Sequence, residues 1–339
     1  MQTVRVSNVE TDPQETVCTD GPEGEDGTAA PVEVLEPRDV PLGGPRAMTV
    51  RRTLPQRQRS MVGAWCFADH YGPDDVAATG GMDVPPHPHT GLQTVSWLFT
   101  GEVEHRDSLG THCLVRPGEL NLMTSGAGIA HSEVSTPGTT VLHGAQLWVA
   151  LPAVHLDAPR RFQHHVPDAV RVDGATVRVF LGTLAGQRSP VETFTPLLGA
   201  ELVLDPGATL TLDVDPAYEH GVLADSLGLA VDDTGLDRGA LAFVPPARDH
   251  LTLTNDSAEP ARALLLGGPP FEEEVVMWWN FVGRSHEDVV AAREEWMAHS
   301  DRFGEVAGYE GPVQHLPAPV IPAVRIRPRS NASRAPRDS

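Results

Sequence analysis

The sequence has 339 residues, enough for two domains, and its 40% of hydrophobic residues is typical of a globular protein. The 32 glycines and 31 prolines disfavour long helices and indicate short strands joined by tight turns. The formal charge of −21 repels phosphate backbones, so we expect no direct binding of nucleic acid. No apolar run approaches the roughly 18 residues that cross a bilayer, so we expect no membrane span.

The first segment, residues 1–31, is acidic and poor in large apolar residues, so we expect it to be flexible. It has neither the basic start nor the apolar core of a secretory signal. The three cysteines, Cys18, Cys66 and Cys113, are odd in number and far apart, which argues against a disulfide framework. Both features predict a cytoplasmic protein.

Residues 32–156 contain short β-like runs that end in Gly, Pro or Asp, such as LQTVSWLFTG (92–101) and VLHGAQLWVALP (141–152). A connector is expected at 157–184, and a second β-rich region occupies 185–284. Many short, evenly spaced strands are typical of β-barrels and sandwiches. We therefore predict an all-β chain with two barrels.

One helix is predicted near the end of the chain. In SHEDVVAAREEWM (285–297), Ser285 and Asp288 have the spacing of a capping box, and good helix formers follow. We expect a helical segment over residues 285–310. The Pro- and Arg-rich residues 311–339 are then predicted to form a disordered tail.

The two β-rich regions look like weak copies of one another. RPGELNLMTSGAGIAHSE (116–133) and DRGALAFVPPARDHLTL (237–253) each pass from a glycine turn to an apolar strand and then to a histidine. The second region has His220 and His250 but neither H-x-H nor H-x-E. This pattern fits a duplicated barrel in which only the first copy keeps a metal centre.

Two short motifs in the first region have the spacing of metal ligands. His87 and His89 lie two residues apart, and His131 and Glu133 repeat that spacing; in a strand, each pair points to one face. Fifteen histidines make some close pairs by chance, so neither pair is diagnostic alone. Together they offer three imidazoles and one carboxylate, unlike the cysteine-rich sites of structural zinc. Such a set suits iron(II), and also manganese, copper or nickel.

The other candidate ligands fit this pattern less well. His105 and His112 lie between the two pairs but have no partner two residues further on. His164 and His165 are adjacent, so in a strand they would point to opposite faces. Cys113 is most simply a small buried apolar residue. We therefore leave these residues out of the predicted site.

Four motifs together resemble the pirin family of the cupin superfamily: HPHTGLQTVSWLFTGEVEHRDSLG, RPGELNLMTSGAGIAHSE, GAQLWVALP and VMWWNFVGR. The likeness covers roughly residues 35–310. It implies a bicupin, with two double-stranded β-helix barrels face to face in one chain. It also implies one iron, held in the first barrel by His87, His89, His131 and Glu133, and a second barrel without metal.

One position departs from the superfamily pattern. Cupins in general carry a glutamate four residues after the second histidine of H-x-H, where this chain has Gln93. An amide is a poor metal ligand and no base, but it can donate a hydrogen bond to a bound oxygen species. We therefore expect Glu133 to accept the substrate proton and Gln93 to orient a bound oxygen.

The resemblance implies two functions from different classes. Pirin relatives open flavonols such as quercetin with dioxygen, which would make this chain a quercetin 2,3-dioxygenase-type enzyme. Other pirins are iron-dependent regulators that bind a transcription factor or a metabolic enzyme. The acidic composition favours a protein partner over DNA for such a regulator. The sequence leaves both functions open, with a metal-binding remnant as a third reading.

Overall fold

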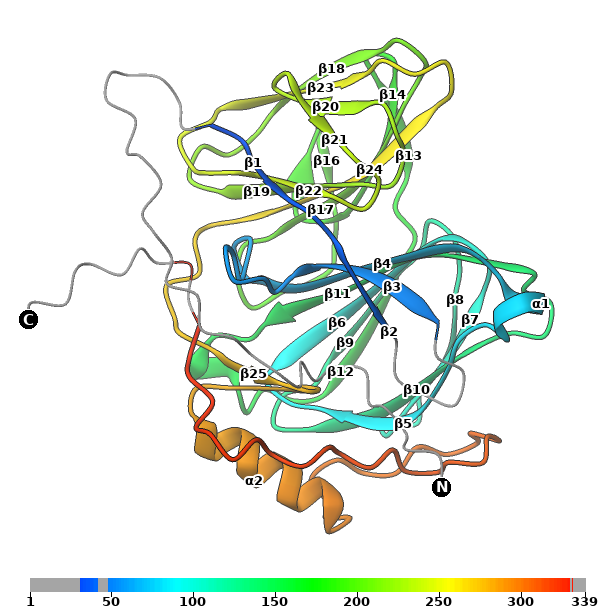
Figure 1. The fold of residues 1–339 in the computed structure, drawn as a ribbon, viewed down its shortest axis with the longest axis vertical. Coiled ribbons are helices and arrows are strands. Elements are labelled where there is room, and N and C mark those ends of the chain that lie inside the picture. The colour runs from blue at the N-terminus through cyan, green and yellow to red at the C-terminus, as the bar shows by residue number, and fades with distance from the viewer. Residues whose placement is uncertain (1–30, 42–47, 330, 332–339) are drawn as a thin grey trace, which may run out of the picture.

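Two stacked β-barrels make up most of the protein, and each contains one seven-stranded and one four-stranded sheet (Figure 1). The computed structural model describes residues 31–41, 48–329 and 331, so the predicted flexible segment lies almost wholly outside the described residues. In this part of the chain, α2 (His286–Met297) is the only helix longer than four residues. The predicted all-β class with a short C-terminal helix is therefore confirmed.

The first barrel carries both predicted ligand pairs. Its large sheet has the order β12-β9-β6-β11-β4-β3-β2, and its small sheet has the order β5-β10-β7-β8. Two short helices, α1 (Val76–Thr79) and η1 (Ala153–His155), connect its strands. The strands are β2 (Arg38–Pro41), β3 (Thr49–Leu54), β4 (Trp65–Asp75), β5 (Asp83–His89), β6 (Leu92–Thr100), β7 (Val103–Asp107), β8 (His112–Val115), β9 (Leu120–Thr124), β10 (Ile129–Ser135), β11 (Val141–Ala150) and β12 (Arg161–His165).

The second barrel repeats this plan. Its large sheet has the order β1-β22-β19-β24-β17-β14-β13, and its small sheet has the order β18-β23-β20-β21. Two hairpins, β15-β16 and β25-β26, stand outside these sheets. The strands are β1 (Glu33–Leu35), β13 (Ala169–Val172), β14 (Ala175–Leu181), β15 (Thr183–Leu184), β16 (Gln187–Arg188), β17 (Leu198–Leu204), β18 (Thr209–Asp213), β19 (Glu219–Ala224), β20 (Leu229–Val231), β21 (Thr234–Leu236), β22 (Leu241–Val244), β23 (His250–Asn255), β24 (Ala261–Gly268), β25 (Val276–Trp278) and β26 (Phe281–Gly283).

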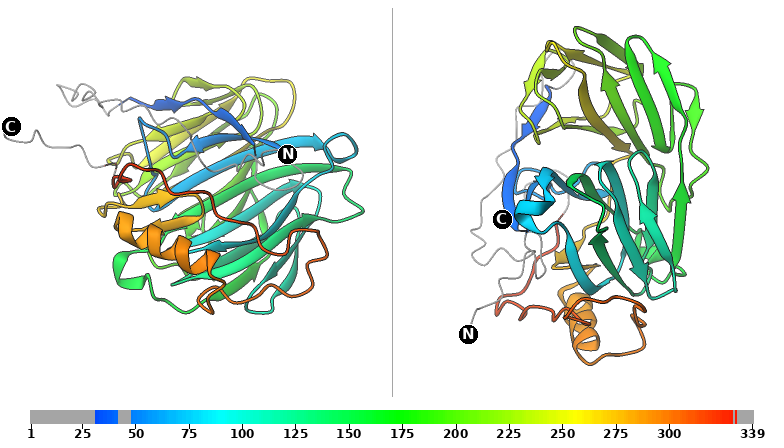
Figure 2. Two further views of the ribbon diagram at one scale, coloured as in Figure 1. Left: turned by 60° about the horizontal axis from the view of Figure 1, so that its bottom comes forward. Right: turned by 90° about the vertical axis from the view of Figure 1, so that its right-hand side faces the viewer.

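The two large sheets face each other and share a buried apolar core (Figure 2). The rings of Trp97 in the first barrel and Phe180 in the second stack with centroids 4.5 Å apart. The indole N–H of Trp65 lies 3.2 Å from the carbonyl oxygens of both Leu198 and Gly267. Because Trp97 stacks and Trp65 donates hydrogen bonds across the interface, within one continuous apolar core, the barrels form one packed unit.

Strand pairing divides the chain differently from the expected boundaries. Strand β1 precedes the first barrel in sequence but pairs with β22 of the second. Within the expected connector, 157–184, β12 pairs with β9 of the first barrel, whereas β13 and β14 join the second. The hairpin β25-β26 falls inside the expected second barrel but contacts the first, where the Val282 N–H donates to the Thr90 carbonyl at 3.0 Å.

Helix α2 begins where the sequence predicts it but ends at Met297, so residues 298–310 of the expected helical segment are not helical. Ser285 is the N-cap and accepts from the backbone N–H of Asp288, whose side chain accepts from the Ser285 backbone N–H. Three side chains along one face, Val289, Ala292 and Trp296, are buried. No helix in the described part of the chain is long and apolar enough to cross a membrane.

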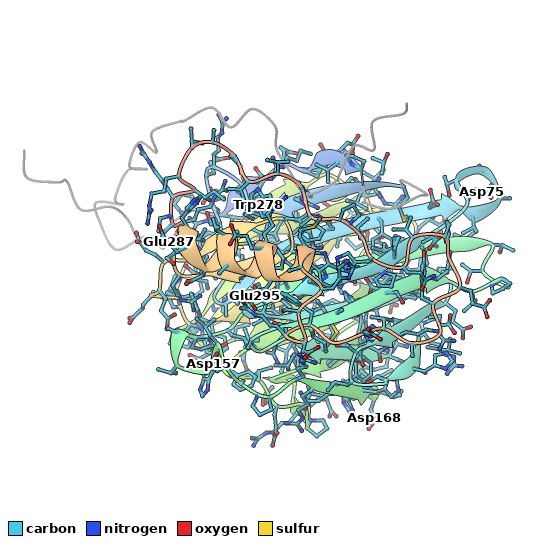
Figure 3. The ribbon with its side chains drawn as sticks, turned by 90° about the horizontal axis from the view of Figure 1, so that it is seen from below. Asp75, Asp157, Asp168, Trp278, Glu287 and Glu295 are labelled. Atoms are coloured by element: carbon cyan, nitrogen blue, oxygen red, sulfur yellow. The ribbon has the colours of Figure 1, made fainter. Side chains whose placement is uncertain are left out.

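Residues 311–329 pack against the first barrel, where a disordered tail was expected. Figure 3 views this side, with α2 and the C-terminal segment lying across it. Leu316 and Ala318 are buried in one cluster with Trp296, whose indole N–H donates to the Leu316 carbonyl at 2.8 Å. The Leu316 N–H donates to the Pro86 carbonyl of β5 at 2.8 Å. A few apolar residues among the prolines thus anchor the segment beside the predicted ligands.

Candidate metal centre

Three neighbouring strands of the small sheet in the first barrel present pairs of ligand-type side chains. In the β5-β10 pairing, His87 lies opposite His131. In the β10-β7 pairing, Asp107 and His105 lie opposite His131 and Glu133. Because side chains two apart share a face, the motifs H-x-H, H-x-E and H-x-D all point to the barrel interior.

Three predicted ligands, His87, His89 and His131, meet in this interior. Nε2 of His89 lies 3.0 Å from Nε2 of His131, and the ring centroids of His87 and His131 are 4.3 Å apart. One ring nitrogen from each histidine lies within 4.8 Å of the other two. All three are buried, with exposures of 5%, 1% and 1%.

In two of these rings, the nitrogen that points away from the cluster, Nδ1, hydrogen-bonds a backbone carbonyl. Nδ1 of His87 lies 2.8 Å from the Pro85 oxygen, and Nδ1 of His89 lies 3.2 Å from the Asn280 oxygen. Carbonyls only accept, so each Nδ1 carries the hydrogen and each Nε2 keeps its lone pair. Burial lowers the pKa of His87 to about 4 and that of His89 well below its usual value, which keeps both rings neutral.

The free ring nitrogens of these histidines suit a transition metal as ligands. Neutral imidazole nitrogens are common ligands of iron, manganese, nickel, copper and zinc. Two nitrogens bound at right angles to one ion, each at about 2.1 Å, are roughly 3.0 Å apart. That separation matches the 3.0 Å between Nε2 of His89 and Nε2 of His131. The buried rings are therefore already spaced for a shared ion.

Glu133 belongs to a second group of ligand-type side chains, which shares His131 with the first group. Single ligand atoms of His105, His131 and Glu133 lie within 4.8 Å of one another, whereas Glu133 does not join His87 and His89 within that limit. The Ser96 hydroxyl donates to Oε1 of Glu133 at 3.2 Å, and burial raises the pKa of this carboxyl. To complete the predicted set of four ligands, the carboxylate would have to swing from Ser96 toward the three imidazoles.

Gln93 lies away from the histidine cluster, which corrects the expected catalytic role. Its Nε2 donates to Oγ1 of Thr124 at 2.9 Å on the large sheet. Alternate residues from Gln93 to Trp97 face the second barrel, where Trp97 stacks on Phe180. Ser96 is three residues from Gln93 on β6, so its side chain points to the opposite face, toward the barrel interior and the histidine cluster. An uncharged amide suits the buried position of Gln93 between the barrels.

Two residues outside the predicted site, His105 and Asp107, also belong to the cluster. The expectation that His105 has no ligand-type partner two residues on is wrong, because Asp107 is such a partner on β7. Nε2 of His105 lies 3.2 Å from Oδ2 of Asp107, and Nδ1 of His105 lies 3.4 Å from Nδ1 of His131. The H-x-D spacing of His105 and Asp107 is the signal in the sequence that identifies both residues.

A second histidine cluster, which no motif of the sequence predicts, lies between the barrels. Nε2 of His70 and Nε2 of His143 lie 2.7 Å and 2.5 Å from Oδ1 of Asp225. Arg51 Nε donates to Nδ1 of His70 at 3.1 Å, so the Nε2 of His70 carries the hydrogen and has no lone pair for a cation. Arg262 also donates to Asp225, at 3.2 Å. The cluster is therefore a salt-bridged hydrogen-bond network.

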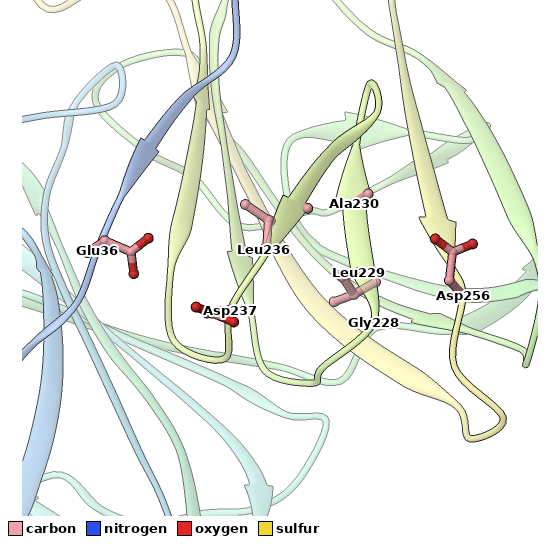
Figure 4. A pocket seen from close by; sticks show the side chains of 8 residues that line it. Glu36, Gly228, Leu229, Ala230, Leu236, Asp237 and Asp256 are labelled. Carbon is pink, nitrogen blue, oxygen red and sulfur yellow. The ribbon is translucent and has the colours of Figure 1, made fainter.

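The second barrel offers less ligand chemistry in its described residues. His220 is fully buried and neither ring nitrogen has a hydrogen-bond partner there, while His250 is exposed and bonded to its neighbour Asp249. A pocket on this barrel shares no residue with the histidine cluster (Figure 4). It is lined by Glu36, Gly228, Leu229, Ala230, Gly235, Leu236, Asp237 and Asp256.

Comparison with known proteins agrees with this architecture. The pirin family matches residues 47–149, and the pirin C-terminal cupin domain matches residues 199–304. A putative quercetin 2,3-dioxygenase of Pseudomonas aeruginosa is 46% identical over 84% of this chain and 89% of its own length. A pirin-like protein of Caulobacter vibrioides is 34% identical over 78% of this chain and 92% of its own.

Solved structures show the same fold. The crystal structure of a quercetin 2,3-dioxygenase from Acinetobacter baumannii superposes with a TM-score of 0.82 at 37% identity, covering 88% of this chain and 97% of that one. A bacterial pirin from Escherichia coli in complex with nickel(II) has a TM-score of 0.55 at 16% identity, covering 70% and 99%. On these grounds the chain belongs to the pirin family, with two cupin domains in one polypeptide.

Proposed function

We propose that the protein is a quercetin 2,3-dioxygenase-type oxidoreductase that opens a flavonol with dioxygen. One divalent transition metal would be held by His87, His89, His131 and Glu133. The observation that carries the proposal is the convergence of three neutral, buried imidazoles in the first barrel. The names of the relatives from Pseudomonas aeruginosa and Acinetobacter baumannii, at 46% and 37% identity, support the same reaction class.

The chain's own residues would prepare the substrate. When bound, the metal would act as the Lewis acid that lowers the pKa of the flavonol hydroxyl and supplies redox chemistry with dioxygen. Glu133 is the base within reach, because burial raises the pKa of its carboxyl and makes it a stronger proton acceptor than an exposed glutamate. When Glu133 shifts from the metal to Ser96, the Ser96 hydroxyl would hold one carboxylate oxygen and leave the other to accept the substrate proton.

An aromatic wall beside the cluster suits a flat aromatic substrate. The ring of Trp148 lies edge-on to His89, with centroids 5.1 Å apart, and stacks on Phe67 at 4.0 Å. Both side chains are buried, so they exclude water from this side of the imidazoles. Planar flavonols gain apolar and ring-stacking contacts at such a surface.

The test is turnover of a flavonol panel by metal-loaded protein, with detection of carbon monoxide. We expect carbon monoxide from flavonols but none from matched flavones that lack the 3-hydroxyl group. His87→Ala should abolish release. His112→Ala is the matched control, because His112 lies on β8 of the same sheet, is exposed and hydrogen-bonds the Glu104 carboxylate. Fully loaded protein that releases no carbon monoxide from any flavonol would overturn the proposal and direct attention to the regulatory alternative.

A further inference from the structure

We propose that His105 and Asp107 are positioning residues that fix the tautomer and ring orientation of His131, and thereby set how tightly the centre holds its metal. This inference rests on the proposed metal centre and extends it beyond the four predicted ligands. It assigns a function to the H-x-D motif of β7, which the proposed reaction does not otherwise use.

The three side chains form a continuous buried chain. Asp107 Oδ2 lies 3.2 Å from Nε2 of His105, and Nδ1 of His105 lies 3.4 Å from Nδ1 of His131. The other carboxylate oxygen of Asp107 accepts from the backbone N–H groups of Leu109 and Thr111, at 2.9 Å and 3.0 Å. His105, Asp107 and His131 are each at most 3% exposed. The carboxylate is thus fixed by its own loop, and it can fix His105 in turn.

The direction of each hydrogen bond follows from the chemistry of its acceptor. Burial would raise the pKa of Asp107, but hydrogen bonds from His105 and Thr111 lower it overall, so the group is an ionised acceptor. His105 must therefore carry its hydrogen on Nε2, which leaves a lone pair on Nδ1. That lone pair faces Nδ1 of His131, so Nδ1 of His131 carries the hydrogen and its Nε2 keeps a lone pair for the metal.

His131 depends on His105 and Asp107 because the partner of its Nδ1 is a side chain, whereas Nδ1 of each of the other two histidines has a backbone carbonyl. His87 and His89 use the backbone carbonyls of Pro85 and Asn280 as acceptors. For His131 the acceptor is a side chain, and a histidine alone is free to present either tautomer. Asp107 removes that freedom. Loss of such outer partners typically weakens metal affinity about 10–100-fold.

The test compares two amides at position 105 that differ in reach. In His105→Asn, the side-chain oxygen takes the place of Nδ1 and can still accept from His131. In His105→Gln, the amide lies nearer the place of Nε2, where it contacts Asp107 but leaves His131 without an acceptor. Asp107→Ala tests the other end of the chain. His112→Asn and His112→Gln, on the exposed neighbour strand, are matched controls.

Two readouts are measured: the dissociation constant for Ni(II) by chelator competition, and the His131 tautomer by nitrogen-15 NMR of the metal-free protein. We expect His105→Asn to stay within about threefold of wild type, and His105→Gln and Asp107→Ala to weaken binding about 10–100-fold. In wild type, His131 should carry its hydrogen on Nδ1, and in His105→Gln it should become a tautomer mixture. Thermal unfolding verifies that each variant is folded.

The outcomes separate this inference from the proposed function. Equal affinity of His105→Gln, Asp107→Ala and wild type for Ni(II) would overturn the inference and leave the metal centre intact. A wild-type His131 with its hydrogen on Nε2 would overturn it as well. Wild type that binds no metal would contradict the proposed function, and the NMR measurement would still decide the tautomer.

Discussion

Nε2 of His70 in the first barrel lies 2.7 Å from Oδ1 of Asp225 in the second, within the buried space between the barrels. His143 donates to the same oxygen, and Arg262 donates to the other one. Burial would raise the pKa of Asp225, but hydrogen bonds and charge from His143 and His70 lower it far below its usual value. One carboxylate thus joins β4 and β11, which belong to the metal-binding barrel, to the second barrel.

Asp225→Ala should therefore destabilise the whole chain. The substitution leaves the buried His70 and His143 without their acceptor and removes one of the ion pairs of Arg262, and breaking a buried pair costs about 3–5 kcal/mol. Urea unfolding at pH 7 measures the loss in free energy of unfolding. The control is Asp249→Ala, which removes an exposed carboxylate bonded to the adjacent His250. A loss below about 1 kcal/mol in Asp225→Ala would show that the network is not important for stability.

Single ligand substitutions should empty the metal site. His87→Ala and His131→Ala each remove one imidazole and leave a water-filled gap, so we expect losses of affinity larger than the roughly 100-fold typical of an outer contact. Metal content after dialysis, measured by mass spectrometry, tests this. His220→Ala and His250→Ala in the second barrel should retain the metal. Retention of full metal content in His87→Ala and His131→Ala would mean that the ligands are misassigned.

Gln93→Glu should act on stability and leave catalysis without a gain. The new carboxyl would be buried between the barrels, where its pKa rises above the unfolded value of about 4.3. The unfolded state then releases its proton first, so the variant loses stability relative to wild type as the pH rises above about 4.3. Urea unfolding at pH 4.5 and 7.5 measures this difference, with the half-buried Gln187→Glu as control. Faster flavonol turnover by Gln93→Glu would contradict the placement of Gln93.

Local spacing was enough to predict His87 and His89, because side chains two residues apart in a strand share one face of the sheet in any fold. The same rule predicts His131 and Glu133, and it applies equally to His105 and Asp107, which are also two residues apart in a strand. His70 and Asp225 are 155 residues apart in sequence, and no local pattern relates them. Only the packing of one barrel on the other brings them together.

The error at Gln93 has a specific cause. His89 ends β5 in the small sheet, whereas Gln93, four residues later, lies on β6 in the large sheet. The turn between them contains Gly91 at φ +67°, where an added Cβ would lie 2.2 Å from the Val282 oxygen. That tight turn decides which face of β6 meets the cluster, and residue counting along a motif does not include it. The barrel architecture itself was predictable, because its short strands and turns are local features.

Stability should fall in mild acid because of buried neutral histidines such as His220. Burial lowers the pKa of His220 to about 4, whereas the unfolded chain binds its proton near pH 6.5. The unfolded state therefore binds more protons between these values, and the free energy of unfolding decreases as the pH falls from about 6.5 to about 4. His220→Leu should gain about 2 kcal/mol more over wild type at pH 5 than at pH 8. Urea unfolding at both pH values, with exposed His250→Leu as control, measures this; an equal difference at both would contradict it.

Truncation after residue 311 should destabilise the first barrel, because the segment is an integral part of its core. The truncation removes the buried side chain of Leu316, and the indole N–H of Trp296 loses the Leu316 carbonyl as its acceptor. Burial of one leucine contributes about 2 kcal/mol and an unsatisfied buried donor costs about 1–3 kcal/mol, so we expect a loss of roughly 3–5 kcal/mol. The truncation also removes the hydrogen bond to the Pro86 carbonyl, next to His87, so affinity for Ni(II) should fall too. Urea unfolding and chelator competition test both effects, with deletion of only residues 332–339 as control. A truncated protein as stable as the full chain would restore the view, drawn from its proline and arginine content, that this segment is a dispensable tail.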